Sequence, residues 1–177
     1  MIVDSQTKIE LNNLVTALIG RTNFKPKWFI SVHYKSNRSS RHNFEDYEFK
    51  IISEVHTIDK VEKNFKHLKN LLLCKVYDVS NANRIRCNKF RFLAFNELGE
   101  AKYNYHSHIV IEDIPDYPTL EDVEDLLEAV QLRHKGIENL ETAIDIRLIY
   151  SDGWIDYVLK TATQSFTPLD ITNSDIN

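Results

Sequence analysis

Residues 89–112 read KFRFLAFNELGEAKYNYHSHIVIE, and this stretch decides the fold. Aromatic and β-branched residues are frequent in Lys89–Asn96 and again in Tyr103–Glu112, which predicts two strands. The segment Leu98–Glu100 lies between them and contains a glycine, so we expect a turn there. The stretch is therefore predicted to be a β-hairpin.

On both sides of the hairpin, strand patterns alternate with helix patterns. Strands are expected at Lys27–Tyr34 (KWFISVHY), which is rich in aromatic and β-branched residues, and at Ala143–Tyr150 (AIDIRLIY), which alternates apolar and polar residues. Helices are predicted at Ser5–Ile19, with Gly20 at the end, at Thr57–Leu73, and at Thr119–Gly136, with a basic last turn. A fourth helix is predicted from Asp152, as its cap, to Gln164. The order helix, strand, helix, hairpin, helix, strand, helix predicts an α+β fold, with a central antiparallel sheet flanked by helices.

The length of 177 residues predicts a single domain, since domains contain about 150 residues. Residues 1–24 are expected to be an N-terminal helical extension, and residues 165–177, which show no periodicity, a flexible tail. No apolar run approaches the roughly 18 residues that span a bilayer, and residues 1–10 lack the features of a signal peptide. Two cysteines are too few for a disulfide scaffold. We therefore expect a cytoplasmic protein without a membrane partner.

Two histidines in the second strand of the hairpin indicate a metal site. His106 and His108 are two residues apart, so both side chains leave the same face of a strand. If the strands pair around the turn, the carboxylate of Glu97 reaches both imidazoles from the neighbouring strand. This donor set with open positions is typical of a catalytic site, and Mn²⁺ or Mg²⁺ suits phosphate chemistry. The alternative is a histidine pair on the surface without a metal, because such pairs also occur by chance.

A tyrosine and a lysine in the last predicted helix form the second candidate group. Tyr157 and Lys160 are three residues apart, which places them on one helix face, about 5–6 Å apart. An ammonium group beside a tyrosine can stabilise its oxyanion, so Tyr157 is a candidate nucleophile. Trp154 and Gln164 share or border this face. The alternative is a tyrosine that packs on the sheet beside a solvated lysine.

Together these motifs resemble those of the HUH endonucleases, in particular the single-tyrosine replication initiators (Rep proteins) of rolling-circle plasmids and viruses. KWFISVHY is similar to motif 1 of that family, YHSHIVIE to the two-histidine motif 2, and DYVLK to the YxxK of motif 3. The resemblance spans Lys27 to Gln164. The family usually has a hydrophobic residue between its histidines, where this chain has Ser107 on the opposite face of the strand.

The resemblance implies a nuclease fold of the ferredoxin/RRM-like type and the site-specific nicking and joining of single-stranded or hairpin DNA. It implies a metal ion on Glu97, His106 and His108. It also implies that Tyr157 forms a 5′-phosphotyrosine bond and frees a 3′-OH, with assistance from Lys160. Host or viral replication proteins would be partners, in the cytoplasm of the host cell.

The net charge of −4 argues mildly against a protein that binds nucleic acid, so its basic residues would have to gather locally. Candidate DNA contacts flank the first strand, lead into the hairpin or lie on the last helix: Lys27, Lys35, Arg38, Arg41, Arg86, Lys89, Arg91, Trp154 and Gln164. Much of the acidic charge lies in Glu121–Glu128, on a helix that is expected to face away.

Three other interpretations stay open. An HUH transposase or mobilisation relaxase would share the chemistry described above. A cupin-like metal protein would use Gly99, His106, His108 and Glu112, although such barrels are all-β and rich in glycine turns. A non-catalytic DNA-binding module would contain the histidines as structural residues.

Overall fold

The computed structural model describes residues 5–34, 58–80, 91–98, 105–134, 144–160 and 168–175. In these ranges the chain forms four strands and four helices. The strands are β1 (Trp28–His33), β2 (Phe92–Leu98), β3 (Tyr105–Ile111) and β4 (Ile144–Leu148), and the helices are α1 (Ser5–Thr22), α2 (Ile58–Val76), α3 (Leu120–Gln131) and α4 (Gly153–Val158). Each predicted strand and helix is present, with shifts at the ends. None of the described helices is both long and apolar enough to cross a membrane.

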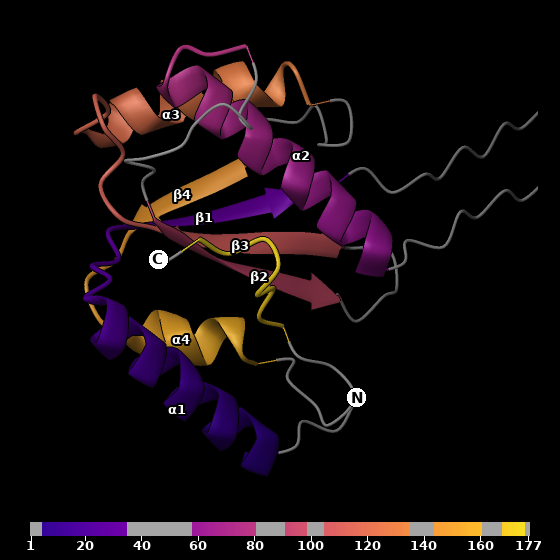
Figure 1. The fold of residues 1–177 in the computed structure, drawn as a ribbon, viewed down its shortest axis with the longest axis vertical. Coiled ribbons are helices and arrows are strands. Elements are labelled where there is room, and N and C mark those ends of the chain that lie inside the picture. The colour runs from indigo at the N-terminus through magenta and orange to yellow at the C-terminus, as the bar shows by residue number, and fades with distance from the viewer. Residues whose placement is uncertain are drawn as a thin grey trace, which may run out of the picture.

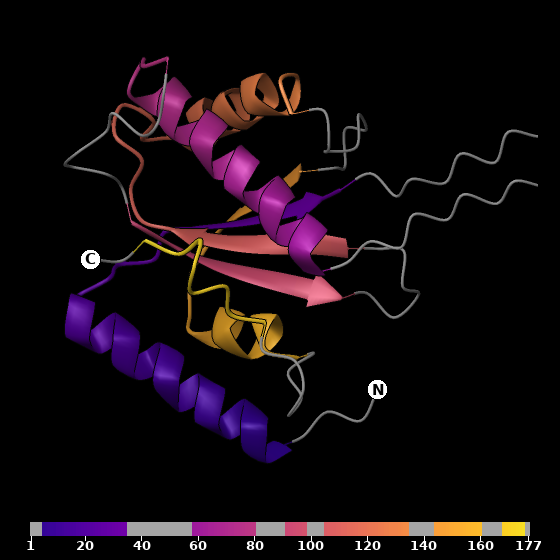
Figure 2. The same cartoon turned by 45° about the vertical axis from the view of Figure 1, so that its right-hand side comes forward.

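The four strands form one antiparallel sheet in the order β2-β3-β1-β4. The chain order β1-α2-β2-β3-α3-β4 makes two interleaved βαβ units, because β3 lies between β1 and β2 in the sheet. Helices α2 and α3 lie on one face of the sheet, and α1 and α4 lie on the other (Figure 1, Figure 2). The fold is therefore α+β with a central antiparallel sheet flanked by helices, as predicted.

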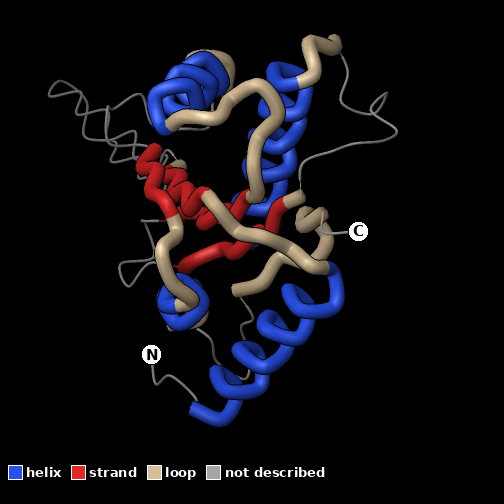
Figure 3. Tube along the Cα trace, turned by 90° about the vertical axis from the view of Figure 1, so that its left-hand side faces the viewer, coloured by secondary structure: helices blue, strands red, loops and turns tan. Residues whose placement is uncertain are grey.

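The sheet separates two hydrophobic cores, because side chains alternate between the two faces of a strand. Trp28, Ile30 and Val32 of β1 pack with α2 and α3 in the first core. Phe29 points the other way and joins the apolar residues of α1 and α4 in the second core. Figure 3 shows the strands between the two helical layers. Val110 of β3 belongs to this second core, so His108, two residues before it, lies on the face that α1 and α4 cover.

Helix α1 runs through Gly20 and ends at Thr22, so the glycine does not terminate the helix as predicted. Asn23 adopts a positive φ of 51° directly after the helix. The N–H of Phe24 donates to the carbonyl of Ile19 at 3.2 Å, as in a Schellman helix end. Asparagine tolerates this left-handed conformation better than most residues and provides the C-terminal signal instead.

Helices α3 and α4 are shorter than predicted. The start of α3 has the expected cap, since the Thr119 side chain accepts from the N–H of Asp122, and the Asp122 side chain accepts from the N–H of Thr119. The helix ends at Gln131, so its last turn contains no basic residue, and Gly136 lies outside the described ranges. Asp152 precedes α4, but its side chain makes no capping hydrogen bond. Residues 161–164 of the predicted helix also lie outside the described ranges.

Residues 168–175, which were expected to belong to a flexible tail, instead lie along the outer edge of β2. The N–H of Phe92 donates to the carbonyl of Asp175 at 2.8 Å, and the N–H of Asn96 donates to the carbonyl of Pro168 at 2.8 Å. The segment, yellow in Figure 1, pairs with β2 at isolated positions and not as a continuous strand. Because only isolated residues of the segment pair with β2, the sequence of the segment does not need the periodicity of a strand.

A buried polar network joins this segment to the back of the hairpin. The hydroxyl of Tyr34 donates to Ser107 Oγ at 3.2 Å, and Ser107 Oγ donates to Asn96 Oδ1 at 2.7 Å. Asn96 Nδ2 and Asn173 Nδ2 both donate to Asp170 Oδ2, at 3.1 and 2.7 Å. All five side chains are buried. Ser107 therefore points away from the histidine face, as predicted.

We expect Asp170→Ala to lower the free energy of unfolding by about 1–3 kcal/mol, because two buried amides lose their acceptor. Urea denaturation followed by circular dichroism measures this change. Ile171→Ala is the control from the same segment, since its side chain is exposed and its loss should change stability by less than about 0.5 kcal/mol. Equal stabilities of the two variants would contradict a structural role for the network.

Candidate metal centre

The β2–β3 hairpin brings the three predicted metal ligands together. Glu97 pairs directly with His106, and His108 lies two residues further along β3 on the same face. The Oε2 atom of Glu97 lies 3.0 Å from Nε2 of His106 and 3.1 Å from Nε2 of His108. The three ligand atoms all lie within 4.8 Å of one another. The predicted cluster is confirmed, and it could hold a divalent metal ion.

The chemistry of this donor set fits such an ion. Imidazole nitrogens and carboxylate oxygens are common ligands of divalent metals, and three protein ligands leave positions for water or substrate. His108 is only 1% exposed, and Glu97 is also buried. A chance pair of surface histidines has neither this burial nor a carboxylate between its rings. The cluster therefore has the composition and the setting of a binding site.

Two residues of β1 support the histidines, and neither is evident from the motifs. Ser31 Oγ lies 2.9 Å from Nδ1 of His108, so it orients this ring through the nitrogen that faces away from Glu97. His33 stacks on His106, with 5.0 Å between the ring centroids. Both contacts follow from the register of β1 and β3, which pairs Ser31 with His108 and His33 with His106. The only signal in the sequence is that Ser31 and His33 share one face of KWFISVHY.

Burial and hydrogen bonding together set the charges of the cluster. Burial by itself raises the pKa of Glu97, but hydrogen bonds from His106, His108 and Lys160 outweigh it and hold that pKa well below its usual range. Burial lowers the pKa of His108, although its hydrogen bond to Glu97 opposes this shift. Near pH 7 Glu97 is therefore ionised and His108 is neutral. These are the protonation states that metal ligands need.

Tyr157 and Lys160 lie beside this cluster, although Lys160 follows the end of α4 and is not within the helix. The ring of Tyr157 meets the ring of His108 edge-on, with centroids 5.2 Å apart. Lys160 Nζ lies 3.0 Å from Glu97 Oε2 and 4.0 Å from the centroid of the Tyr157 ring. Burial by itself lowers the pKa of Lys160, but Glu97 and Tyr157 raise it above its usual value. Lys160 is therefore a charged partner of the site, although its side chain is still 39% exposed.

A pocket of about 580 Å³ lies over the cluster. Strands β1, β3 and β4 and the end of α4 form its walls, with Ser31, His33, His106, His108, Ile144, Asp145, Arg147, Tyr157 and Lys160. Its volume lies within the range of ligand pockets, about 300–1,000 Å³. Tyr157 is 47% exposed and accessible to a ligand in this space. The sequence motifs do not indicate Asp145 or Arg147, which reach the pocket because β4 pairs with β1.

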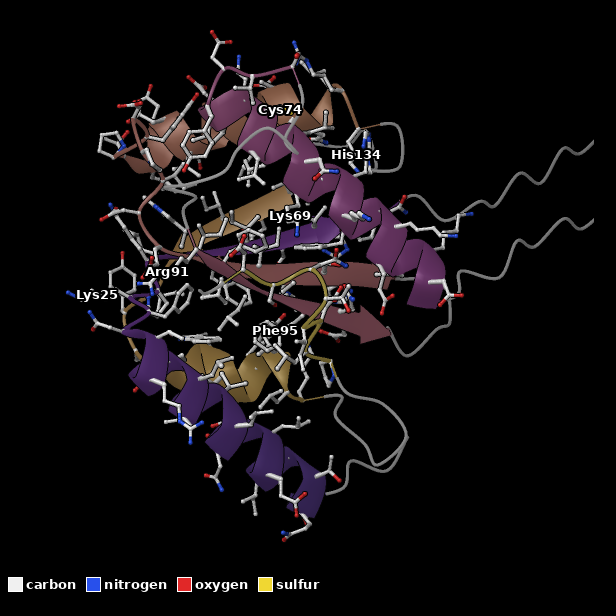
Figure 4. All side chains as sticks on the ribbon, viewed as in Figure 1. Lys25, Lys69, Cys74, Arg91, Phe95 and His134 are labelled. Carbon is white, nitrogen blue, oxygen red and sulfur yellow. The ribbon has the colours of Figure 1, made fainter. Side chains whose placement is uncertain are left out.

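Two of the predicted DNA contacts have structural roles at the other end of the sheet. Arg91 donates to both carboxylate oxygens of Glu112, at 2.8 and 2.6 Å, and to the carbonyls of Thr22 and Asn23 after α1. Figure 4 shows Arg91 near Lys25, beside the end of α1. Lys27 forms an ion pair with Asp113. Both cations lie where β3 ends, whereas the histidines lie near its start.

Trp154 belongs to the second core and is not available to stack on a base. Its side chain is 7% exposed and meets Phe95 at a steep angle, with ring centroids 6.0 Å apart. Figure 4 shows Phe95 on the side of the sheet that faces α4. The other predicted contacts lie outside the described ranges: Lys35, Arg38, Arg41, Arg86, Lys89 and Gln164.

The chain matches no model of a known protein family, and no curated protein is significantly similar to it. The fold excludes the cupin-like interpretation, because the described part of the chain has helices on both faces of an open sheet and not an all-β barrel. Glu112, which that interpretation needs beside the histidines, is held by Arg91 at the far end of the hairpin.

We expect Ser31→Ala to weaken the binding of Mn²⁺ by about 10- to 100-fold, because the loss of a hydrogen bond that orients a ligand histidine has effects of this size. Isothermal titration calorimetry of the folded variant measures the affinity. Ser80→Ala removes an exposed hydroxyl beyond the end of α2 and should bind Mn²⁺ as the wild type does. An unchanged affinity in Ser31→Ala would show that this serine does not support the ligand.

Proposed function

We propose that this protein is a metal-dependent endonuclease that nicks and rejoins single-stranded DNA at a specific site through a tyrosine. We place it among the single-tyrosine replication initiators of the HUH endonucleases. The main support is that His106, His108, Tyr157 and Lys160 line one pocket, and that Glu97 contacts both histidines and Lys160. A cation site, a nucleophile and a fixed positive charge are the groups that transfer of a phosphodiester to tyrosine needs. The interleaved βαβ units are compatible with the ferredoxin/RRM-like nuclease fold of that family.

In the proposed reaction, the hydroxyl oxygen of Tyr157 attacks the phosphorus of a DNA phosphodiester. The new oxygen–phosphorus bond forms as the bond from phosphorus to the 3′ oxygen breaks. The phenolic proton passes to water, and the leaving 3′ oxygen takes a proton from water. The products are a 5′-phosphotyrosine and a free 3′-OH. Attack of a 3′-OH on the phosphotyrosine reverses these steps and joins the strands.

The residues around Tyr157 have separate roles in this scheme. Glu97, His106 and His108 would hold a divalent ion, which when bound neutralises charge on the phosphate oxygens. We favour Mn²⁺ over Mg²⁺, because Mg²⁺ is usually bound by oxygen and the cluster offers two nitrogens. Lys160 would stabilise the phenolate as it develops, since its ammonium lies 4.0 Å from the centroid of the tyrosine ring.

The remaining alternatives are weaker for different reasons. Transposases and mobilisation relaxases of the HUH group would use the same chemistry, and the lysine three residues after Tyr157 favours the replication type. A DNA-binding module without catalysis needs no ionised carboxylate between two histidines and a lysine, which this site contains. For this reason we propose an enzyme.

The proposed substrate is single-stranded or hairpin DNA, and the proposed partners are host or viral replication proteins in the cytoplasm. The net charge of −4 is compatible with this substrate. Helix α3, which contains five of the 26 acidic residues, lies on the face of the sheet opposite to α4 (Figure 1). Its repulsion of DNA at the pocket is therefore reduced by distance and screening.

We expect the protein with Mn²⁺ to cut single-stranded DNA from a random pool and to remain attached to the product, while relaxed duplex of the same sequences stays intact. Denaturing gel electrophoresis detects the adduct, and sequencing of the attached strands identifies the cut site. The rate should fall steeply with salt, because contacts to the DNA backbone release counterions. EDTA is the control and should stop the reaction. Equal cutting of duplex and single strand, or cutting without an adduct, would contradict the proposal.

A further inference from the structure

We propose that a second pocket beside Tyr157 binds the base of the nucleotide that stays attached to the tyrosine after cleavage. This pocket has a volume of about 330 Å³ and lies between β4 and α4. Its walls share Ser31, Asp145, Arg147 and Tyr157 with the pocket over the metal ligands. The tyrosine therefore contributes to both spaces. The inference rests on the proposed nuclease function and adds a substrate subsite to it.

The lining of the second pocket suits a single nucleobase. Tyr150 and Tyr157 supply exposed aromatic surface, while the largely buried rings of Phe29 and Trp154 form the base of the pocket on the side of the second core. The segment between Leu148 and Gly153 closes the pocket along another side. The volume lies at the low end of the range of ligand pockets, about 300–1,000 Å³. A pocket of this kind accepts one unpaired base, which agrees with an enzyme that acts on unpaired DNA.

Two side chains of this pocket extend into solvent and are placed to contact a ligand. Tyr150 is 88% exposed although it is aromatic, and the side chain of Arg147 is 74% exposed. Arg147 Nε donates to Asp145 Oδ2 at 2.9 Å, which restricts the orientation of the guanidinium plane. Aromatic rings and guanidinium planes are the groups on which proteins stack the bases of single-stranded nucleic acids. Both kinds of group occur here at the pocket that the nucleophile lines.

The direction of the displacement decides which nucleotide enters this pocket. In an in-line reaction, the leaving 3′ oxygen departs on the side of phosphorus opposite to the attacking oxygen. The second pocket is lined by Tyr157 but by none of the metal ligands, so in the proposed reaction it lies on the attacking side of the phosphate. The nucleotide whose 5′ oxygen remains on phosphorus is free to turn toward this side, whereas the leaving nucleotide is not. We therefore assign the pocket to the nucleotide immediately 3′ of the cut.

The test uses a fluorescein-labelled single strand with the sequence that the wild type cuts, and a copy with an abasic residue immediately 3′ of the cut. Fluorescence anisotropy without divalent ions measures binding. We expect the wild type to bind the abasic strand about tenfold more weakly. Tyr150→Ala should bind the intact strand about tenfold more weakly and lose nothing further with the abasic strand, because the ring and the base form one interaction. Tyr150→Phe keeps the ring and should still bind the abasic strand about tenfold more weakly than the intact strand. We call this difference in affinity the abasic penalty.

A second variant fills the pocket and leaves its aromatic residues in place. A Cβ atom at Gly153 would meet only Ser151 Oγ, at 3.6 Å, which is an ordinary contact, so the backbone at this position has room for a Cβ. Gly153→Leu should also lose the abasic penalty, while its affinity for Mn²⁺ in calorimetry stays that of the wild type. Ile171→Ala, far along the chain and exposed, is the control for binding and for the penalty.

The outcomes separate this inference from the proposed function. An abasic penalty that persists in both Tyr150→Ala and Gly153→Leu overturns the subsite, and so does the absence of any penalty in the wild type. A penalty that arises only from an abasic residue 5′ of the cut also overturns it, because the pocket would then hold the leaving nucleotide. In each of these cases a covalent adduct with Mn²⁺ would leave the nuclease proposal standing. A wild type that neither binds nor cuts single strands would overturn both.

Discussion

The Tyr157→Phe variant is expected to form no covalent adduct with DNA, although it still binds Mn²⁺ and single-stranded DNA. Phenylalanine keeps the ring that packs edge-on against His108 and Phe29, at centroid distances of 5.2 and 5.7 Å, but it lacks the attacking oxygen. Without that oxygen no phosphotyrosine bond can form, so the adduct should fall below detection, at least about 1,000-fold below the wild-type level. Denaturing gels with labelled DNA measure this loss, and calorimetry and anisotropy measure the two binding reactions.

The matched control is Tyr117→Phe, which removes a tyrosine hydroxyl on the other side of the sheet. Tyr117 packs against the core under α2 and α3, so this variant should form the adduct at the wild-type rate. Mass spectrometry of the trapped wild-type complex should find the nucleotide on Tyr157. A nucleotide on any other side chain, or an adduct in Tyr157→Phe, would refute the assignment of the nucleophile.

The Glu97→Gln variant is expected to bind Mn²⁺ at least about 100-fold more weakly than the wild type. Loss of a ligand should have a larger effect than loss of a hydrogen bond to a ligand, which costs about 10- to 100-fold. The single atom Oε2 of Glu97 lies within 3.1 Å of both histidine Nε2 atoms and of Lys160 Nζ. A neutral amide of the same shape cannot supply the charge that a divalent ion needs at this point. Calorimetry with Mn²⁺ measures the change.

Two further variants make this result specific. His106→Ala should also abolish high-affinity binding, and it is a better choice than a change at His108, which is only 1% exposed and packs in the core. Glu124→Gln, on the exposed face of α3, removes an equal charge far from the cluster and should bind Mn²⁺ normally. Unchanged Mn²⁺ affinity in both Glu97→Gln and His106→Ala would contradict the assignment of these residues as metal ligands.

The cluster could be predicted because all of its ligands lie in one hairpin. The alternation of side chains puts His106 and His108 on one face, and pairing around the turn puts Glu97 opposite His106. The supporting contacts of Ser31 and His33 depend on a strand that is distant in sequence. Nothing in the local pattern states which strand becomes the neighbour of β3, so these two residues could not be assigned in advance.

Two of the predicted DNA contacts lie away from the metal cluster and are paired with acids, and composition does not show which cations are already paired. Arg91 and Lys27 precede apolar strands, as basic residues at a DNA surface would. In the structure the acids that follow β3, Glu112 and Asp113, bind them at the far end of the sheet. Arg147 is a cation at a pocket that the sequence did not indicate. The alternation of its strand was evident, but its position at the pocket depends on the pairing of β4 with β1.

The segment at 168–175 also covers an edge of the sheet at which copies of the chain could otherwise pair with one another. Strand β2 ends the sheet on one side, and a strand in that position offers unpaired N–H and C=O groups to other chains. Here those groups bind to a segment that follows all four strands in the chain. During translation, the edge of β2 therefore stays open until this segment has left the ribosome. A shortened chain that ends before residue 168 would keep that edge open permanently. We expect such chains to aggregate, because β2 of one copy could pair with a strand of another copy and so replace the lost hydrogen bonds.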